Sequence, residues 1–271
     1  MGREARKPVD VLRTLAWLEN LKAISGLQTG YAIGRFVDGP GKQPRAWMSY
    51  DNAEGVPLIG NHPSAAVARA ERLWPDSALR FISPIWKVLN GERLTRRELD
   101  VGLLLISPQV RSIFFKERRG LFHRRVFDLC DMSRVWELHS FEGIVASVLL
   151  MEEAVLAHSP ILREAGFELY ETLRPHMIDV PDLARIWPYL FTSIDSMMPR
   201  WLCVGTNGRK DVRFCWRHEL WARDFHEQKL EYPWLLQQLD CGLPPNVEDI
   251  RYTRKVIPYG AASYPMPLRH R

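Results

Sequence analysis

Apolar residues recur at helical spacing near the start of the chain. The first run begins just after Pro8 and ends at Ser25-Gly26, with apolar positions three or four residues apart. Proline in the first turn and glycine just past the last turn are typical helix boundaries. We therefore predict a helix over residues 9–24. Three further short helices fit the segments 29–37, 44–52 and 64–73.

The helical pattern continues through the rest of the chain. Thr95-Arg96-Arg97-Glu98 has the spacing of a capping box and predicts a helix that stops at Ser107-Pro108. Beyond it, helical spacing fits six segments: 109–117, 121–129, 134–158, 161–173, 180–191 and 219–239. A β-hairpin is expected over 201–216, where two β-favouring runs flank the turn sequence Gly205-Thr206-Asn207-Gly208.

Composition indicates a folded protein. Hydrophobic residues make up 46% and charged residues 25% of the 271 positions, and the ten tryptophans suit helix packing in a core or at an interface. The four cysteines show no C-x-x-C spacing, so reduced thiols in a cytoplasmic protein are expected. The longest apolar run, Gly143–Met151, is far shorter than the roughly 20 residues that cross a bilayer, and it predicts a buried helix without membrane contact.

Charge is distributed unevenly along the chain. Residues 1–125 carry 21 Lys and Arg against 12 Asp and Glu, a net of +9, whereas residues 126–271 carry 16 against 20, a net of −4. A cationic segment of this kind attracts polyanions such as nucleic acid. The acidic second half is a candidate surface for a homodimer or a partner protein.

The segment from Leu12 to Leu73 resembles the Cro/C1-type helix-turn-helix domain. The resemblance rests on Ser25-Gly26-Leu27-Gln28-Thr29, where the family places its scaffold helix, and on Arg45-Ala46-Trp47-Met48-Ser49-Tyr50 followed by Gly55-Val56-Pro57, where it places its reading helix. The link from Phe36 to Arg45 is longer than the tight turn of the family. The resemblance implies that the second helix of the pair lies in the major groove of DNA.

The resemblance also implies which side chains would meet DNA. Base-edge contacts would come from Gln43, Arg45, Ser49 and Asn52, and phosphate contacts from Arg35 and Lys42. Arginine can pair with guanine, and asparagine or glutamine with adenine. The alternative is a small helical bundle in which the aromatic residues of this segment are core.

A second cationic stretch lies between residues 111 and 125. Its basic side chains alternate with three phenylalanines and a histidine, an arrangement that suits phosphate contacts and base stacking. The basic residues are Arg111, Lys116, Arg118, Arg119, Arg124 and Arg125. On helices, the same residues could form an ordinary solvated face above buried aromatic rings, or a contact with a partner protein.

Catalytic and metal motifs are incomplete. His218-Glu219 lacks the second histidine of H-E-x-x-H, and the acidic residues and histidines over 137–158 supply no paired E-x-x-H motif. Cys130 lies beside two aspartates, which disfavour a thiolate. The sequence therefore predicts no cofactor and no metal, and it does not favour an enzyme.

Together these patterns predict a mainly α protein with an N-terminal helix-turn-helix-like subdomain, a C-terminal helical bundle and the hairpin over 201–216. We expect domain boundaries at 1–90, 91–257 and 258–271, the last an extended tail. The expected function is nucleic-acid binding, foremost to double-stranded DNA, in a transcriptional regulator or in a mobile-element or antiviral defence system. The alternative is a non-catalytic helical subunit of a larger nucleoprotein or protein complex.

Overall fold

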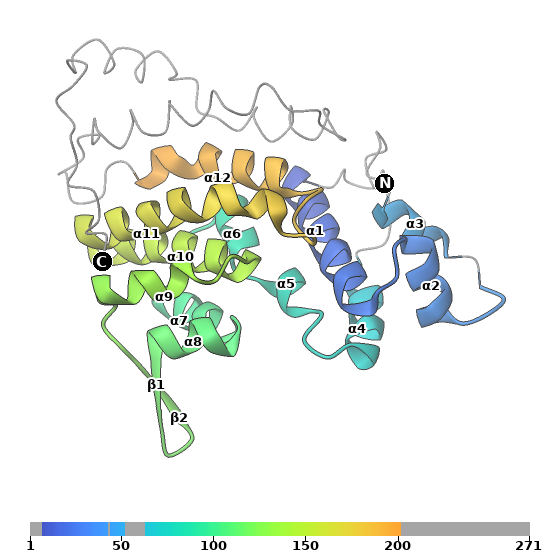
Figure 1. Ribbon diagram of the computed structural model, residues 1–271, viewed down its shortest axis with the longest axis horizontal. Coiled ribbons are helices and arrows are strands. Elements are labelled where there is room, and N and C mark those ends of the chain that lie inside the picture. The colour runs from blue at the N-terminus through green and yellow to red at the C-terminus, as the bar shows by residue number, and fades with distance from the viewer. Residues whose placement is uncertain (1–6, 43, 52–62, 202–271) are drawn as a thin grey trace, which may run out of the picture.

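The computed structural model describes residues 7–42, 44–51 and 63–201. This part of the chain is mainly helical, as the sequence predicts, with one two-stranded antiparallel sheet (Figure 1). The elements of the first half are α1 (Pro8–Ser25), α2 (Gly30–Asp38), α3 (Arg45–Asp51), α4 (Ser64–Leu73), α5 (Leu79–Ile82), α6 (Ile85–Leu89), α7 (Arg96–Leu104) and α8 (Pro108–Phe114). They are followed by β1 (Phe115–Arg118), β2 (Leu121–Arg124), the 3-10 helix η1 (Leu129–Asp131), α9 (Met132–Trp136), α10 (Phe141–Ala157), α11 (Pro160–Leu173), the 3-10 helix η2 (Arg174–Asp179) and α12 (Trp187–Trp201).

Helix α1 joins two apolar cores. Its first half, with Leu12 and Leu15, packs into the large core formed with α6 to α12. Its second half, with Trp17 and Leu21, packs into a smaller core formed with α2 to α5. In Figure 1, α2, α3 and α4 accordingly lie at one end of the molecule, next to α1, and the helical bundle lies on its other side. A substitution on the buried face of α1 can therefore affect the packing of either core.

The smaller core is built from aromatic rings. Trp17 lies with its ring centroid 5.6 Å from that of Trp47 and 6.0 Å from that of Phe81, and all three are buried. The indole Nε1 of Trp47 donates a hydrogen bond of 3.0 Å to Asp38, which satisfies its polar group inside the core. The aromatic residues of the candidate reading helix α3 are thus core residues, and its exposed residues are Arg45, Ala46 and Met48.

Helices α2 and α3 approach each other closely because α2 carries glycine where they cross. A Cβ atom added at Gly34 would lie 2.4 Å from Cβ of Pro44 and 2.5 Å from Cδ1 of Trp47. We expect Gly34→Ala to lower the free energy of unfolding by about 1–3 kcal/mol, because neither the proline ring nor the packed indole can move aside freely. Urea denaturation followed by circular dichroism would measure this change.

The matched control is Arg35→Ala, an exposed position on the same helix. It should leave stability within about 0.5 kcal/mol of the unaltered protein. A Gly34→Ala variant as stable as this control would mean that the two helices do not pack at the distance described.

The bundle is centred on α10, which packs along α11. Almost every side chain of α10 from Phe141 to Ala154 is buried, as expected for a helix that is apolar all round. Gly166 of α11 permits the close crossing, since a Cβ there would lie 2.8 Å from Cγ of Met151. Among the described helices, none combines the length and the apolar character that crossing a membrane requires.

The predicted capping box at the start of α7 is present. The hydroxyl of Thr95 accepts a hydrogen bond from the backbone N–H of Glu98, and the Glu98 carboxylate accepts one from the backbone N–H of Thr95. The same carboxylate forms an ion pair with Lys87 at 2.8 Å. The hydrogen bond from Lys87, followed by those from Thr95, lowers the pKa of Glu98 from 4.5 to about 2.

This shift predicts a dependence of stability on pH. The folded-state pKa of Glu98 lies below its unfolded value of 4.5, so its contribution is complete above pH 4.5 and is lost as the pH falls towards about 2. We expect Glu98→Gln to reduce the loss of stability between these two pH values, measured as urea midpoints at several pH values. Glu137→Gln is the control, because Glu137 is exposed and its side chain forms no hydrogen bond or ion pair with the described residues. An unchanged slope in Glu98→Gln would contradict the assignment.

Residues 109–129 differ from the sequence-based expectation. Two helices are predicted there, but helix α8 ends at Phe114 and the chain continues as the hairpin of β1 and β2. Arg119 and Gly120 both have positive φ, 54° and 75°, as a two-residue type I′ turn requires. Glycine adopts this conformation without strain, and the turn matches the twist of the two strands. A hairpin can therefore form here, although the apolar residues of the segment also fit helical spacing.

Two other helices have different bounds from those predicted. The segment 134–158 is divided into α9 and α10, because Ser140 caps the start of α10 with a hydrogen bond from Gly143. The segment 180–191 is a turn followed by α12, which continues to Trp201. The hairpin predicted over 201–216 lies outside the described residues except for Trp201, which is helical. The proposed domain boundaries at 90 and 257 stay predictions.

Candidate nucleic-acid interface

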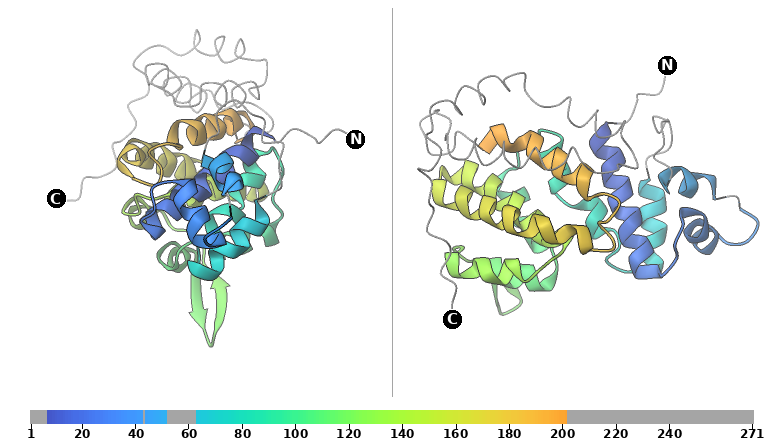
Figure 2. Two further views of the ribbon diagram at one scale, coloured as in Figure 1. Left: turned by 90° about the vertical axis from the view of Figure 1, so that its right-hand side faces the viewer. Right: turned by 45° about the horizontal axis from the view of Figure 1, so that its top comes forward.

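The hairpin of β1 and β2 projects from the helical bundle as an arm. Figure 1 and the left view of Figure 2 show its two strands extending beyond the helices. Opposite residues pair in the register Lys116 with His123 and Arg118 with Leu121. A backbone hydrogen bond of 2.8 Å from Arg125 to Phe114 continues the pairing into the base of the arm.

One face of the arm is cationic. Side chains alternate between the faces of a strand, and directly opposite residues share one face. Lys116, Arg118, Leu121 and His123 therefore lie on one face, and all four are exposed. Arg119 is exposed in the turn beside them. The arm presents three cations, Lys116, Arg118 and Arg119, and none of them forms an ion pair with a described residue. We call these three residues the arm cations.

The base of the arm is fixed by Arg124. Its guanidinium pairs with the Glu153 carboxylate of α10 and lies 3.6 Å from the carboxylate of Asp100 on α7. It also lies over the rings of Phe114 and Phe115, 5.0 and 5.3 Å from their centroids. Only 16% of this side chain and 9% of that of Glu153 are exposed. Desolvation lowers the pKa of Arg124, although Glu153 and Asp100 act in the opposite direction.

Arg111 and Arg125 are likewise engaged near the base. The Arg111 guanidinium lies over the Phe122 ring, 5.0 Å from its centroid. Arg125 lies 3.6 Å from Asp131 and donates to the backbone oxygen of Ser112. Of the six basic residues that the sequence groups together, three hold the arm in place and three extend along it.

Sequence reasoning did not identify the acidic partners of this arrangement. Asp100 and Glu153 are 24 and 29 residues away from Arg124 in the chain. Neither lies in a recognisable motif with Arg124. Only the packing of α7 and α10 against α8 and the arm brings these charges together.

The residues implied by the helix-turn-helix resemblance lie on a separate surface. Arg35 is exposed on α2, Lys42 in the link after it and Arg45 at the start of α3. Ser49 is half-buried and donates to the backbone oxygen of Ala46. Gln43 and Asn52 lie outside the described residues.

Figures 1 and 2 place α2 and α3 at one end of the molecule and the arm on the bundle, well apart. The two cationic segments therefore do not merge into one continuous patch. Helices α2 and α3 form close to where the resemblance implies them, and their use as a scaffold and reading pair stays a prediction.

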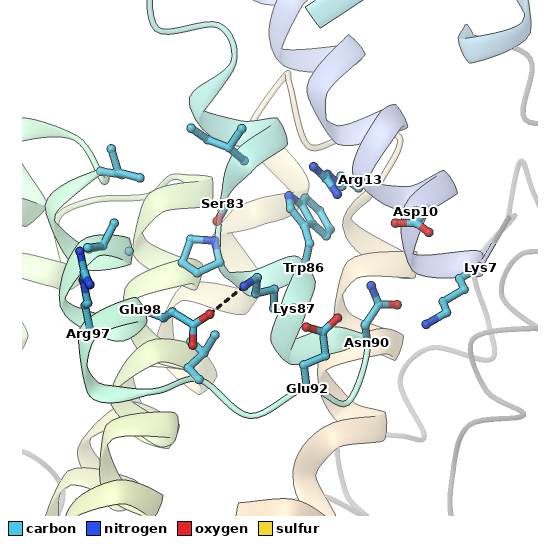
Figure 3. Close-up of a pocket in the computed structure, with 16 residues that line it drawn as sticks. Lys7, Asp10, Arg13, Ser83, Trp86, Lys87, Asn90, Glu92, Arg97 and Glu98 are labelled. Atoms are coloured by element: carbon cyan, nitrogen blue, oxygen red, sulfur yellow. Dashed lines mark hydrogen bonds and ion pairs between the residues drawn. The ribbon is translucent and has the colours of Figure 1, made fainter. Parts of the chain in front are cut away.

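A cavity of about 530 Å³ lies between α1, α6 and α7 (Figure 3). Trp86 contributes to its apolar lining, together with Pro84 and Gly102, and the Lys87–Glu98 ion pair also lines it. Its volume is within the range of small-molecule sites. The lining carries both positive and negative side chains, so its charge does not select one class of ligand.

The described residues contain no cluster of three or more histidine, cysteine, aspartate or glutamate side chains that could hold a metal ion. Glu152, one of the acidic residues considered as a ligand, accepts hydrogen bonds from Arg200 and from the indole of Trp201. Burial raises its pKa, although Arg200 acts in the opposite direction. His218, Glu219 and the neighbouring His226 lie outside the described residues.

Comparisons of this chain with protein-family models, with curated proteins and with solved structures find no match.

Proposed function

We propose that this protein binds nucleic acid through the arm of β1 and β2. The observation that carries the proposal is the position of Lys116, Arg118 and Arg119 on a hairpin that extends beyond the bundle. These cations are held away from the acidic groups of the bundle, so their positive charge is not neutralised there and they can approach phosphates from several directions. Each phosphate that they neutralise releases condensed counterions, which drives binding without base contacts.

Double-stranded DNA is the proposed partner. A two-stranded β-ribbon fits the major groove of B-form DNA, whereas the major groove of A-form RNA is deep and narrow. The exposed basic residues Arg35 of α2 and Arg45 of α3 would add a second contact if the helix-turn-helix resemblance holds. In this proposal the protein acts in regulation of transcription or in a mobile-element or defence system.

A second candidate is a non-catalytic subunit of a nucleoprotein or protein complex. It is favoured by exposed apolar side chains near the arm, where Phe122 is 42% and Val126 is 92% exposed. In that case the arm would dock on a protein partner or on a nucleic acid already held by one. Sequence-specific protection of duplex DNA by the isolated protein would favour the first candidate.

The proposal is tested by titrating the full chain into a labelled duplex between about 50 and 200 mM salt. Binding should weaken steeply with salt, because phosphate contacts carry it. An affinity that does not change over this range would exclude phosphate contacts by the arm as the basis of binding.

A further inference from the structure

Leu121 is an apolar side chain at the tip of a cationic arm. It follows the turn residues Arg119 and Gly120 directly and lies opposite Arg118 in the strand register. Its side chain is 64% exposed, and it belongs to neither of the two apolar cores. The fold of the described residues therefore gives this leucine no packing role.

The neighbours of Leu121 determine what it can meet. Arg118 shares its face of the ribbon, Lys116 lies two residues further along that face, and Arg119 is in the adjoining turn. Phe122 differs, because it lies on the opposite face and its ring is partly covered by the guanidinium of Arg111. Leu121 is therefore the exposed apolar side chain on the face of the ribbon that carries Lys116 and Arg118.

Resting on the proposed function, we infer that Leu121 is a wedge that enters the base stack of double-stranded DNA while Arg118 and Arg119 bind the flanking phosphates. Apolar side chains inserted between base steps unstack them and kink the duplex. The wedge is assigned to duplex DNA because the major groove of B-form DNA admits a two-stranded ribbon, whereas the major groove of A-form RNA is too deep and narrow for one.

The wedge predicts a sequence preference at base steps to which the protein makes no hydrogen bonds. Pyrimidine–purine steps such as TA and CA unstack at low cost, whereas A-tracts are stiff. The protein should therefore bind a duplex with a central TA step more tightly than an A-tract duplex of equal length and charge. Lys116, Arg118 and Arg119 would contribute equally to both.

The experiment uses the full chain and a duplex that carries, at its TA step, an adenine analogue whose fluorescence is quenched by stacking. The unaltered protein should increase this fluorescence, and Leu121→Ala should abolish the increase. Leu121→Ala should also weaken binding to the TA duplex by about tenfold, the effect of losing one buried leucine side chain. Its binding to the A-tract duplex and its salt dependence should be unchanged, because all the cations remain.

Ile161→Ala is the matched control, since Ile161 is 68% exposed and belongs to α11, outside the arm. It should behave like the unaltered protein in every measurement. Equal urea midpoints for both variants would show that neither substitution disturbs the fold, as expected at exposed positions.

Three outcomes would overturn the wedge, and they are distinguishable. Duplex binding with a steep salt dependence but no unstacking would exclude the wedge and leave the proposed function intact. Absence of duplex binding would exclude both. Binding to phosphatidylserine vesicles that depends on Leu121, without a change in the DNA signal, would assign the arm to a membrane surface instead.

Discussion

Replacing Arg118 and Arg119 by alanine should weaken binding to duplex DNA by roughly 10- to 60-fold at about 0.1 M salt. Each phosphate contact contributes about 0.9 to the slope of log affinity against log salt, so loss of two contacts should reduce that slope by about 1.8. Both side chains are exposed on the arm, and neither forms a hydrogen bond or an ion pair with the described residues. Fluorescence anisotropy titrations at several salt concentrations would measure both quantities.

The control for this prediction keeps the same change in net charge. Arg72 on α4 and Arg97 on α7 are exposed, and neither belongs to the arm. Alanine at both positions should leave the affinity within about threefold, because only long-range attraction is altered. If this control loses as much affinity as the arm variant, binding follows total charge and the arm has no special part in it.

A third variant separates the arm from the helix-turn-helix surface. Lys42 and Arg45 lie at the other end of the described structure. If α3 reads bases, alanine at both positions should reduce discrimination between sequences, whereas loss of the arm cations should weaken binding to all sequences equally. A Lys42/Arg45 variant with unchanged affinity and unchanged salt dependence would remove α3 from the function.

Arg124→Ala should lower the free energy of unfolding by about 2–3 kcal/mol. The substitution leaves the largely buried carboxylate of Glu153 without its main partner, and loss of one member of a buried pair is costly. Arg96 still reaches Glu153 at 2.9 Å, which limits the loss. Urea denaturation of the single variants Arg124→Ala and Glu153→Ala and of the double variant would measure the coupling.

The double variant should lose less stability than the two single losses added together, because it leaves no unpaired charge at this site. Arg118→Ala serves as the control and should stay within about 0.5 kcal/mol of the unaltered protein. If Arg124 instead contacts phosphate, as its place in the cationic stretch over 111–125 suggests, Arg124→Ala should leave stability unchanged and lower the salt dependence of DNA binding. The two measurements together decide whether Arg124 anchors the arm or contacts phosphate.

Much of the helical framework could be predicted from local pattern alone. Helix α1 lies where apolar spacing and Pro8 place it, and the capping box of Thr95 and Glu98 starts α7 as its spacing predicts. These features depend on residues within a few positions of each other. Their sequence signals can therefore be recognised without knowledge of the tertiary structure.

The arm could not be predicted in the same way. The three phenylalanines over 114–122 fit helical spacing as well as they fit a short hairpin, and Arg119-Gly120 is a weaker turn signal than Asn-Gly. Tertiary contacts at the base of the arm favour the hairpin over a helix. Phe114 and Phe115 are buried in the bundle core, and Arg124 reaches Glu153 and Asp100.

The sequence by itself determined that this protein is mainly helical and that its basic residues are concentrated in the first half, because both are properties of residue type and local order. Only the tertiary structure decided which of those basic residues face solvent. Arg124 and Arg118 are chemically identical and six positions apart, yet one is held between two carboxylates and the other extends on the arm. An ion pair depends on distance in space, and that distance is set when α7 and α10 pack beside the hairpin.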